Sequence, residues 1–224
     1  MSQTKSLDAG VVRSDLAMSD GRVIRYYDST DRVREAKDLR PTEEQPGIGE
    51  LRLDPLLNEW VVMAAHRQGR IFLPPKELCP LCPTTGELLT EIPESDFEVV
   101  VFDNRSPSLR PPVGDWALPD LVGPDTDLGT AAGKCEVICF TAEHGNAFKD
   151  LTPQRVRTLL EAWIDRTSEL SQENYIEHIA PFENRGEEIG VTLSHPHGQI
   201  YAYSYIPPRV EKMLAAAKKY KEQT

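Results

Sequence analysis

The sequence predicts an α+β fold, in which short strands form a sheet and one long helix packs against it. Segments with strand-like patterns recur between residues 22 and 205, and a single stretch near residues 153–170 has the spacing of an amphipathic helix. The chain has 224 residues, and we find no internal repeat. This length is enough to bury a sizeable core in one large domain or in two small ones.

Charge and hydropathy disfavour several classes of protein. The net charge is −11, from 36 acidic and 25 basic residues, whereas a broad nucleic-acid-binding surface needs clustered Lys and Arg. A small phosphate held in a local pocket is compatible with this charge. No run approaches the ~18 apolar residues that a membrane span needs, and the N-terminus lacks a signal-peptide pattern. We therefore expect a cytoplasmic protein that binds neither nucleic acid nor membranes.

The N-terminal part of the chain is polar. We expect residues 1–46 to form an extension with one short strand at Arg22–Tyr27, and residues 47–224 to form the main domain. The stretch from Asp31 to Gly49 is rich in charge and contains two prolines, which is typical of a linker or a surface loop.

Strands and Pro-rich loops are expected in the first half of the main domain. Leu51–Ala64 alternates in polarity, turns near its middle and resumes, which predicts a hairpin. Phe97–Phe102 is almost wholly apolar and predicts a central strand. Around these segments we expect a knuckle at residues 77–87, a loop at residues 107–127 and a strand at Lys134–Thr141.

The clearest helix runs from about Pro153 to Leu170. Thr152 is suited to cap its N-terminus, and proline is favoured at the first helical position. The helical spacing predicts one apolar face, made of Val156, Leu159, Leu160, Trp163 and Ile164. After this helix we expect a strand at Asn174–Glu183, a turn at Asn184–Gly190, a strand within Val191–Tyr205 and an amphipathic helix at Pro208–Lys221.

The sharpest chemical signal is the run His195-Pro-His197-Gly-Gln199. If the run is extended, residues 195, 197 and 199 project to one face in steps of about 7 Å. Gly198 is expected to leave room for a ligand to approach the backbone. The plain alternative is a pair of surface histidines in an ordinary strand.

Two loops could hold phosphate oxygens. The first contains Asn184, Gly190 and Thr192, and loops of this kind offer backbone N–H groups and hydroxyls to anions. The second follows His66 and carries Arg67 and Arg70; a solvated loop is the alternative there.

A metal site is predicted at Cys79 and Cys82, because two thiolates at CxxC spacing can share one tetrahedral zinc ion. His144 and His195 are the candidate further ligands, and an unmetallated pair of buried cysteines is the alternative. Cys135 and Cys139 are interpreted as buried packing residues and are the rival ligands. We expect His178 to be structural.

Seven motifs in one order resemble the N-terminal half of the galactose-1-phosphate uridylyltransferase family, which belongs to the histidine-triad-like superfamily. They lie between about Leu51 and Pro208 and read DPLLNEWVV, AHRQGR, CPLC, VVVFDN, CFTAEH, FENRG and HPHGQ. The resemblance implies a histidine-triad-like antiparallel sheet with one long helix and a C-terminal helix.

The resemblance also implies a reaction, which is uridylyl transfer between UDP-glucose and galactose 1-phosphate in the Leloir pathway of galactose metabolism. His197 would form a covalent uridylyl-histidine, glucose 1-phosphate would leave, and a hexose 1-phosphate would then accept the uridylyl group to give UDP-galactose. A neutral imidazole is a good phosphorus nucleophile near pH 7.

Site residues carry over from the family by position. The implied zinc ligands are Cys79, Cys82, His144 and His195, and the implied sugar-phosphate arginines are Arg67 and Arg70. The implied uridine and phosphate contacts are Leu81, Asn104, Phe182, Asn184, Gly190, Thr192 and Gln199.

Gln199 replaces the third histidine of the hydrolases in this superfamily. An imidazolium can protonate a leaving group, whereas an amide cannot. Gln199 can still donate a hydrogen bond to phosphoryl oxygens, so a covalent intermediate is expected to persist until a sugar phosphate arrives.

The chain departs from the family pattern in four respects. Arg105 stands where the family has Asp or a similar residue after the uridine-contacting Asn, and Thr192 stands where it often has Ser. We do not expect the second metal of some members, since Met213 occupies its Glu position. The chain also ends at Thr224, where the family continues into a second domain. We therefore expect a homodimer or a complex with a separate C-terminal half.

Two other functions are compatible with these residues. One is a nucleotide-sugar or dinucleoside-polyphosphate phosphorylase, which base preference would distinguish. The other is a non-catalytic, zinc-stabilised nucleotide-binding subunit that assembles with the missing half.

Overall fold

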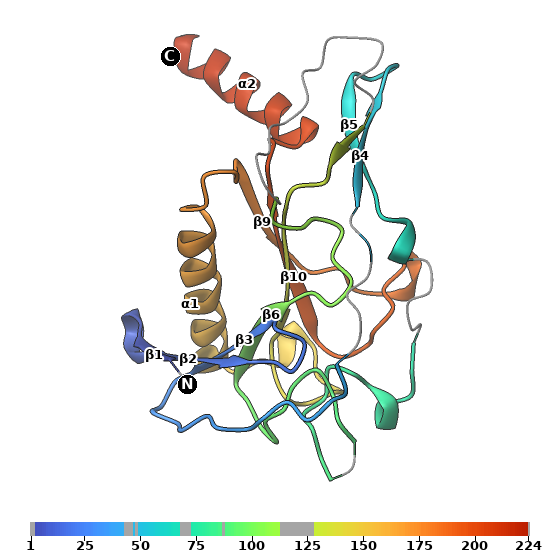
Figure 1. Cartoon of the computed structure of the whole chain (residues 1–224). Coiled ribbons are helices and arrows are strands. Elements are labelled where there is room, and N and C mark those ends of the chain that lie inside the picture. The colour runs from blue at the N-terminus through green and yellow to red at the C-terminus, as the bar shows by residue number, and fades with distance from the viewer. Residues whose placement is uncertain are drawn as a thin grey trace.

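The computed structural model of the chain describes residues 3–42, 47, 49–67, 73–86, 88–112 and 128–223. Within these ranges, seven strands form one antiparallel sheet in the order β1-β2-β3-β6-β8-β10-β9 (Figure 1). The strands are β1 (Gln3–Ser6), β2 (Val12–Ala17), β3 (Val23–Asp28), β6 (Val99–Asp103), β8 (Gly133–Cys139), β9 (His178–Phe182) and β10 (His197–Tyr203). The two α-helices of the described residues are α1 (Pro153–Leu170) and α2 (Pro208–Gln223).

The central position of β6 confirms the prediction from its apolar run. Val99, Val100, Val101 and Phe102 are all buried, because both faces of the strand are covered. The side chains of Val99 and Val101 join the core beneath α1, whereas those of Val100 and Phe102 join a second core on the opposite face. The sheet therefore separates two apolar layers.

The predicted hairpin forms a second, smaller sheet. In the described part of the chain it consists of β4 (Glu50–Asp54), β5 (Glu59–Met63) and β7 (Leu128–Thr130), in the order β5-β4-β7. The Asp54 side chain accepts hydrogen bonds from the backbone N–H groups of Leu56 and Leu57, at 2.9 and 3.2 Å. These bonds fix the turn between β4 and β5.

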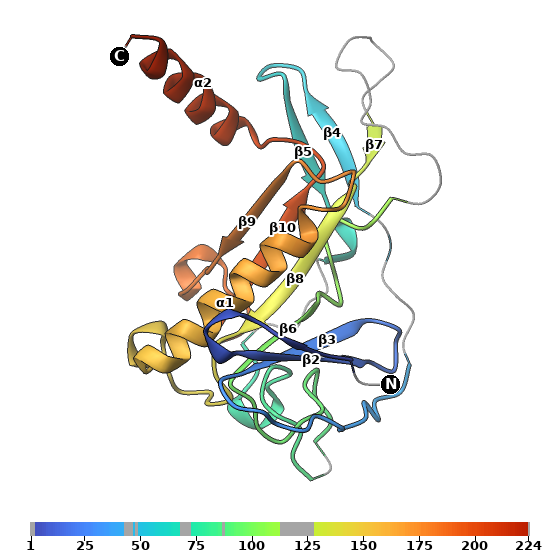
Figure 2. The same cartoon turned by 90° about the vertical axis from the view of Figure 1, so that its left-hand side faces the viewer.

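Helix α1 begins and ends at the predicted residues and covers one face of the sheet (Figure 2). The Thr152 side chain accepts a hydrogen bond from Arg155 N at 3.2 Å, which is the expected N-cap. The predicted apolar face is wrong in part, because Leu160 and Ile164 are 47% and 61% exposed.

The buried face of α1 is partly charged instead. Arg166 lies in it and donates two hydrogen bonds, of 2.9 and 2.7 Å, to the fully buried carboxylate of Glu136 on β8. A buried carboxylate needs such a partner. The helix therefore turns Arg166 toward Glu136 of the sheet. The spacing of apolar residues does not predict this orientation.

The N-terminal segment has more structure than the sequence indicates. One strand was predicted in residues 1–46, at Arg22–Tyr27, and it corresponds to β3 (Val23–Asp28), but β1 and β2 also form. β3 pairs with β6 from Ile24 to Tyr27, so residues 3–28 extend the same sheet as the main domain. Backbone pairing between segments so distant in sequence leaves no local pattern.

The charged stretch after β3 is irregular, as predicted, yet it is held against the sheet. Arg34 is buried and donates hydrogen bonds of 2.9 and 2.6 Å to the two carboxylate oxygens of Asp28. Its Nη1 also donates to the backbone oxygen of Asp96 at 2.6 Å. This part of the chain is therefore an anchored strap, not a free linker.

Helix α2 projects away from the sheet, and none of its residues is buried (Figures 1 and 2). It begins at Pro208, as predicted. No helix among the described residues combines the length and the apolar character that crossing a membrane requires.

The ion pairs beneath α1 give stability a specific dependence on acid. Burial alone would raise the pKa of Glu169, but the hydrogen bond from Arg13 and the charge of Arg166 lower it to about 2. The unfolded value is higher, so Glu169 stabilises the fold fully above about pH 4.5 and loses this effect as the pH falls toward 2. In urea unfolding between about pH 6 and pH 3, the stability gap between wild type and Glu169→Gln should shrink with falling pH. Glu173→Gln, at an exposed site, is the control; a gap that is independent of pH would contradict the assignment.

Candidate functional site

The site lies on the face of the sheet opposite α1, and β10 supplies its central row. Residues alternate along this strand, so His197, Gln199 and Tyr201 are half-buried on the open face. Ile200 and Ala202 point the other way, into the core beneath α1. The pairing of β10 with β8 sets His197 opposite Cys139 and Gln199 opposite Val137.

Gly198 has a packing role that the sequence analysis missed. A Cβ atom at this position would lie 2.7 Å from the backbone oxygen of Phe182 and 2.9 Å from Cζ of Phe140. Both contacts are on the buried side of β10. The expectation that Gly198 leaves room for a ligand is therefore wrong; it leaves room for β9 and an aromatic ring.

His195 does not share a row with His197 and Gln199, contrary to the extended-strand interpretation. Strand β10 begins at His197, and residues 195–196 form a bend. Pro196 has no N–H to donate to a strand ladder, although its carbonyl accepts from Phe140 N at 3.2 Å. The bend turns the ring of His195 into the buried cluster described below, where it is 1% exposed.

The His197 ring is fixed by its own backbone. Its Nδ1 lies 2.7 Å from the carbonyl oxygen of His195. Since a carbonyl only accepts, Nδ1 carries the proton and Nε2 carries the lone pair when the ring is neutral. Burial lowers the pKa of His197 below its ordinary value, which favours the neutral ring.

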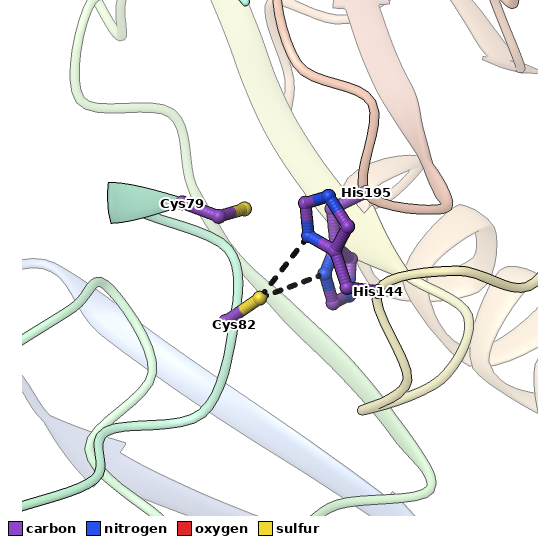
Figure 3. Close-up of side chains that lie close together, drawn as sticks. All are labelled: Cys79, Cys82, His144 and His195. Atoms are coloured by element: carbon purple, nitrogen blue, oxygen red, sulfur yellow. Dashed lines mark hydrogen bonds between the residues drawn. The ribbon is translucent and has the colours of Figure 1, made fainter. Parts of the chain in front are cut away.

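Cys79, Cys82, His144 and His195 come together in one cluster (Figure 3). One ligand atom from each lies within 4.8 Å of the others, and among the described residues this is the group that could hold a metal ion. The two cysteines lie on one tight turn, with Cys82 N donating to Cys79 O at 3.4 Å. The two histidines come from the loop after β8 and from the bend before β10.

The cluster has the dimensions of a tetrahedral site. Cys82 Sγ lies 3.3 Å from Nδ1 of His144 and 3.5 Å from Nδ1 of His195. Zinc bond lengths of about 2.3 Å to sulfur and 2.0–2.1 Å to nitrogen place neighbouring ligand atoms about 3.6 Å apart. The outer nitrogens also have partners, since His195 Nε2 lies 2.8 Å from Thr141 O and His144 Nε2 lies 3.1 Å from Ser194 Oγ. These contacts leave both Nδ1 atoms to the centre of the cluster.

The electrostatics of the cluster also suit a cation. Burial and the neighbouring Cys79 raise the pKa of the Cys82 thiol to about 12, and burial lowers the pKa of His195 to about 4. A bound cation favours the thiolate and uses the lone pair of the neutral imidazole. The four residues present therefore fit a metal ion.

Cys135 and Cys139 are both buried, as predicted for packing residues. Cys139 packs in the same core as Cys79, and Cys135 packs in a third core next to the smaller sheet. The described metal-binding group includes neither.

Next to the cluster, a cavity of about 680 Å³ opens on the same face of the sheet. His197, Gln199 and the residues implied by resemblance line it together. The latter are Arg67, Leu81, Asn104, Phe182, Asn184, Gly190 and Thr192. Arg70 lies outside the described residues.

The cavity has a polar end and an apolar floor. Phe102, Val137 and Gln199 lie side by side on β6, β8 and β10 and form part of the floor. Asn104 follows Phe102 by two residues along the chain, and its backbone N–H donates to Cys135 O on β8 at 2.9 Å. Such a mixture of apolar walls and a few polar groups is typical of sites for small molecules.

Sequence reasoning missed several lining residues, among them Glu91 and Tyr201. Tyr201 could have been found, because it continues the period-2 row of His197 and Gln199. Its hydroxyl accepts a hydrogen bond from Arg67 Nη1 at 2.9 Å. Glu91 gave no signal, because it reaches the cavity through a loop.

The remaining histidines, His66 and His178, belong to neither the described metal-binding group nor the cavity lining. His66 Nε2 lies 3.0 Å from Pro107 O, and Arg67 beside it also bonds Ser108. His178 stacks on Tyr203 with ring centroids 6.2 Å apart, which agrees with a structural role.

Comparison with known proteins identifies relatives of this chain. The family model described as "Galactose-1-phosphate uridyl transferase, N-terminal domain" matches residues 39–207. A protein of Streptomyces lividans named galactose-1-phosphate uridylyltransferase is 42% identical over 213 residues, which are 95% of this chain and 54% of that protein. One of the same name from Thermotoga maritima is 41% identical, over 78% of this chain and 52% of that protein.

More distant relatives carry two kinds of name. An Arabidopsis thaliana protein named ADP-glucose phosphorylase is 26% identical over 78% of this chain and 54% of its own length. A solved structure titled "Structure of uridylyltransferase" aligns with a TM-score of 0.59 and 26% identity, covering 78% of this chain and 52% of that one. The chain spans about half the length of the relatives it matches. It belongs to the galactose-1-phosphate uridylyltransferase family, whose N-terminal domain it matches.

Proposed function

We propose that this chain carries the nucleotidyl-transfer site of a UDP-glucose–hexose-1-phosphate uridylyltransferase, with His197 as the nucleophile. The observation that carries the proposal is the His197 ring, which lines the cavity while its Nδ1–H is bound to the backbone. That bond leaves Nε2 as the nucleophilic nitrogen. The family membership supplies the reaction class.

The reaction takes two displacements at one phosphorus. Nε2 of His197 attacks the α-phosphorus of UDP-glucose, the bond from phosphorus to the bridging oxygen breaks, and glucose 1-phosphate leaves. A phosphate oxygen of galactose 1-phosphate then attacks the same phosphorus, and the P–N bond breaks. UDP-galactose leaves and the neutral ring is restored. The bond from Nδ1–H to His195 O keeps the ring oriented through both steps.

Residues of the cavity would bind the nucleotide on either side of His197. Gln199 lies one strand repeat from His197, about 7 Å away, within reach of the phosphoryl oxygens. Asn184 and Thr192 add polar groups from the loop before β10. Leu81, Phe102 and Val137 offer apolar surface to the base.

We further propose that the Cys79–Cys82–His144–His195 cluster holds zinc. Two thiolates and two imidazoles are a preferred tetrahedral donor set for this ion, and four protein ligands leave no open position. A bound zinc ion would cross-link three segments of the chain. His195 would then be held on one side by the ion and on the other by Thr141 O, and its carbonyl orients His197.

The proposal also covers the preferred nucleotide base and the acceptor of the uridylyl group. The similarity to ADP-glucose phosphorylase favours one second candidate, which is phosphorolysis of an ADP-sugar. The chain matches about half the length of its relatives. We therefore propose that turnover with a hexose 1-phosphate uses a second half, from a separate chain or within a homodimer.

Covalent labelling tests the nucleophile. Wild-type protein incubated with UDP-glucose labelled in the α-phosphate should gain acid-labile, base-stable label. His197→Asn should gain none, because Asn cannot attack phosphorus. Labelled ADP-glucose serves as the comparison for base preference. If wild type stays unlabelled even with a partner half present, the enzyme proposal fails.

Replacing Gln199 by histidine tests the transfer preference. Gln199→His introduces a group that can be protonated and can donate a proton to a leaving group. The ratio of UDP-sugar hydrolysis to exchange should therefore rise, as measured by coupled assays on purified protein. Gln199→Asn is the control without a titratable group; a ratio equal to wild type in both variants would contradict the role of the amide.

Metal content and stability test the zinc site together. Metal analysis should give about one zinc per chain, and Cys79→Ser should lower the melting temperature, because ligand loss costs folding free energy. Cys135→Ser is the matched control at a buried cysteine outside the cluster. A metal-free preparation that melts as the loaded protein does would refute the site.

A further inference from the structure

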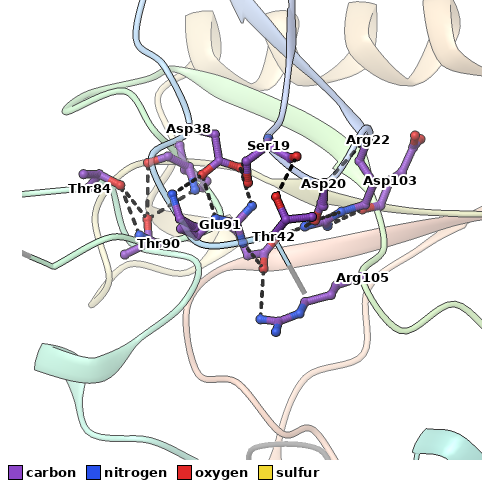
Figure 4. Close-up of polar contacts among 12 residues, drawn as sticks. Ser19, Asp20, Arg22, Asp38, Thr42, Thr84, Thr90, Glu91, Asp103 and Arg105 are labelled. Carbon is purple, nitrogen blue, oxygen red and sulfur yellow. Dashed lines mark hydrogen bonds and ion pairs between the residues drawn. The ribbon is translucent and has the colours of Figure 1, made fainter. Parts of the chain in front are cut away.

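Glu91 is a carboxylate in the cavity wall, and three arginines surround it. Figure 4 shows Glu91 together with Arg22 and Arg105. Arg22 Nη2 donates to its Oε2 at 2.6 Å, and Arg40 Nη1 donates to its Oε1. Arg105 Nη1 lies 3.7 Å from the same Oε1. The side chain of Glu91 is only 8% exposed. A buried carboxylate in this setting is a fixed part of the wall.

Arg22 lies directly before β3 and Arg40 lies in the strap after it, and acidic side chains hold both arginines. Arg22 Nε donates to Asp20 at 2.8 Å, and Arg40 donates to both oxygens of Asp38 at 2.9 and 2.7 Å. Asp38 also accepts from Ser19 N and Oγ at 3.0 and 3.1 Å. Ser19, Asp20, Arg22, Asp38 and Arg40 thus form a polar network against Glu91. Most of this network precedes residue 39, where the match to the family model begins.

Arg105 is the member of this group that faces the cavity with an exposed side chain. It lines the cavity and is 46% exposed. Its 3.7 Å contact with Glu91 is an ion pair but exceeds hydrogen-bonding distance. A guanidinium has five N–H donors in a planar fork. Burial and the nearby charges of Arg40 and Arg22 lower its pKa from the ordinary value. An oxygen acceptor beside the guanidinium would favour its charged form.

The register of the sheet places Arg105 away from the reacting phosphorus. Cys139 faces His197 across the pair β8–β10, and Asn104 N bonds the carbonyl of Cys135, four residues along β8. Four strand residues span about 13 Å. A nucleotide whose α-phosphorus lies at His197 would extend its nucleoside over this distance.

We propose that Arg22 and Arg40 support the nucleoside end of the cavity from behind: they hold Glu91, Glu91 holds Arg105, and Arg105 donates to an oxygen of the nucleoside. Arg105 is then a specificity residue, and Arg22 and Arg40 are positioning residues. The proposal rests on the proposed function, because it assumes that the cavity binds a nucleotide. It assigns a positioning role to two side chains that lie outside the cavity lining.

Calorimetric titration of the full chain with UMP and with uridine tests the contact. Arg105→Ala should weaken both ligands by about tenfold, the usual effect of one hydrogen bond to a charged group. Arg105→Lys should restore part of the loss, since it keeps the charge but not the fork. An Arg105→Ala variant that binds uridine as wild type does would overturn the contact with the nucleoside.

A double-variant cycle tests the positioning role. Arg22→Met should also weaken UMP, but it should have no further effect in the Arg105→Ala background, because it acts through that residue. An undiminished effect there would overturn the chain of contacts and indicate a general structural change. Arg32→Met is the control, since Arg32 lies in the same segment and pairs with Asp96 at the surface; its affinity should match wild type.

Failure of the two proposals can be told apart. If wild type binds neither UMP nor AMP, the cavity is not a nucleotide site and the proposed function fails with the inference. If wild type binds UMP and Arg105→Ala binds it equally well, only the inference fails. Melting temperatures confirm that each variant is folded before titration.

Discussion

The antiparallel pairing of β10 with β8 is the constraint on which the site depends. Its register puts His197 beside Cys139 and Gln199 beside Val137, so backbone hydrogen bonds align the proposed nucleophile with the floor of the cavity. A shift of one residue would exchange every side chain between the cavity and the core beneath α1. The buried Ile200 and Ala202 make that shift costly, and they lock the row of reactive groups in place.

The metal cluster extends this constraint to segments that carry no regular structure. It joins the turn of Cys79 and Cys82, the loop of His144 and the bend of His195. Each is held by only a few local hydrogen bonds. A single four-coordinate centre would bring all three to one point, and the carbonyl that orients the ring of His197 belongs to His195, a member of the cluster. A metal ion bound there would therefore couple the stability of the fold to the orientation of the proposed nucleophile.

Much of this architecture could be predicted from the sequence, because the signals are local. Alternation located the hairpin at Leu51–Ala64, the cap at Thr152 located α1, and CxxC located half of the metal cluster. What could not be predicted depends on contacts between distant segments. β3 pairs with β6, which lies far from it in the sequence. Helix α1 turns Arg166 toward the buried Glu136 and leaves Leu160 exposed. Glu91 reaches the cavity through a loop.

Gly198 of the HPHGQ run serves a different purpose from the residues on either side of it. His197 and Gln199 face the cavity, and Gly198 between them faces Phe140 and the backbone of β9. The pentapeptide therefore meets two unrelated requirements, which are the lining of the cavity on one side and close packing on the other. An alanine at this position in a distant homologue would signal a wider gap between strand and aromatic ring. It would carry no information about the reaction.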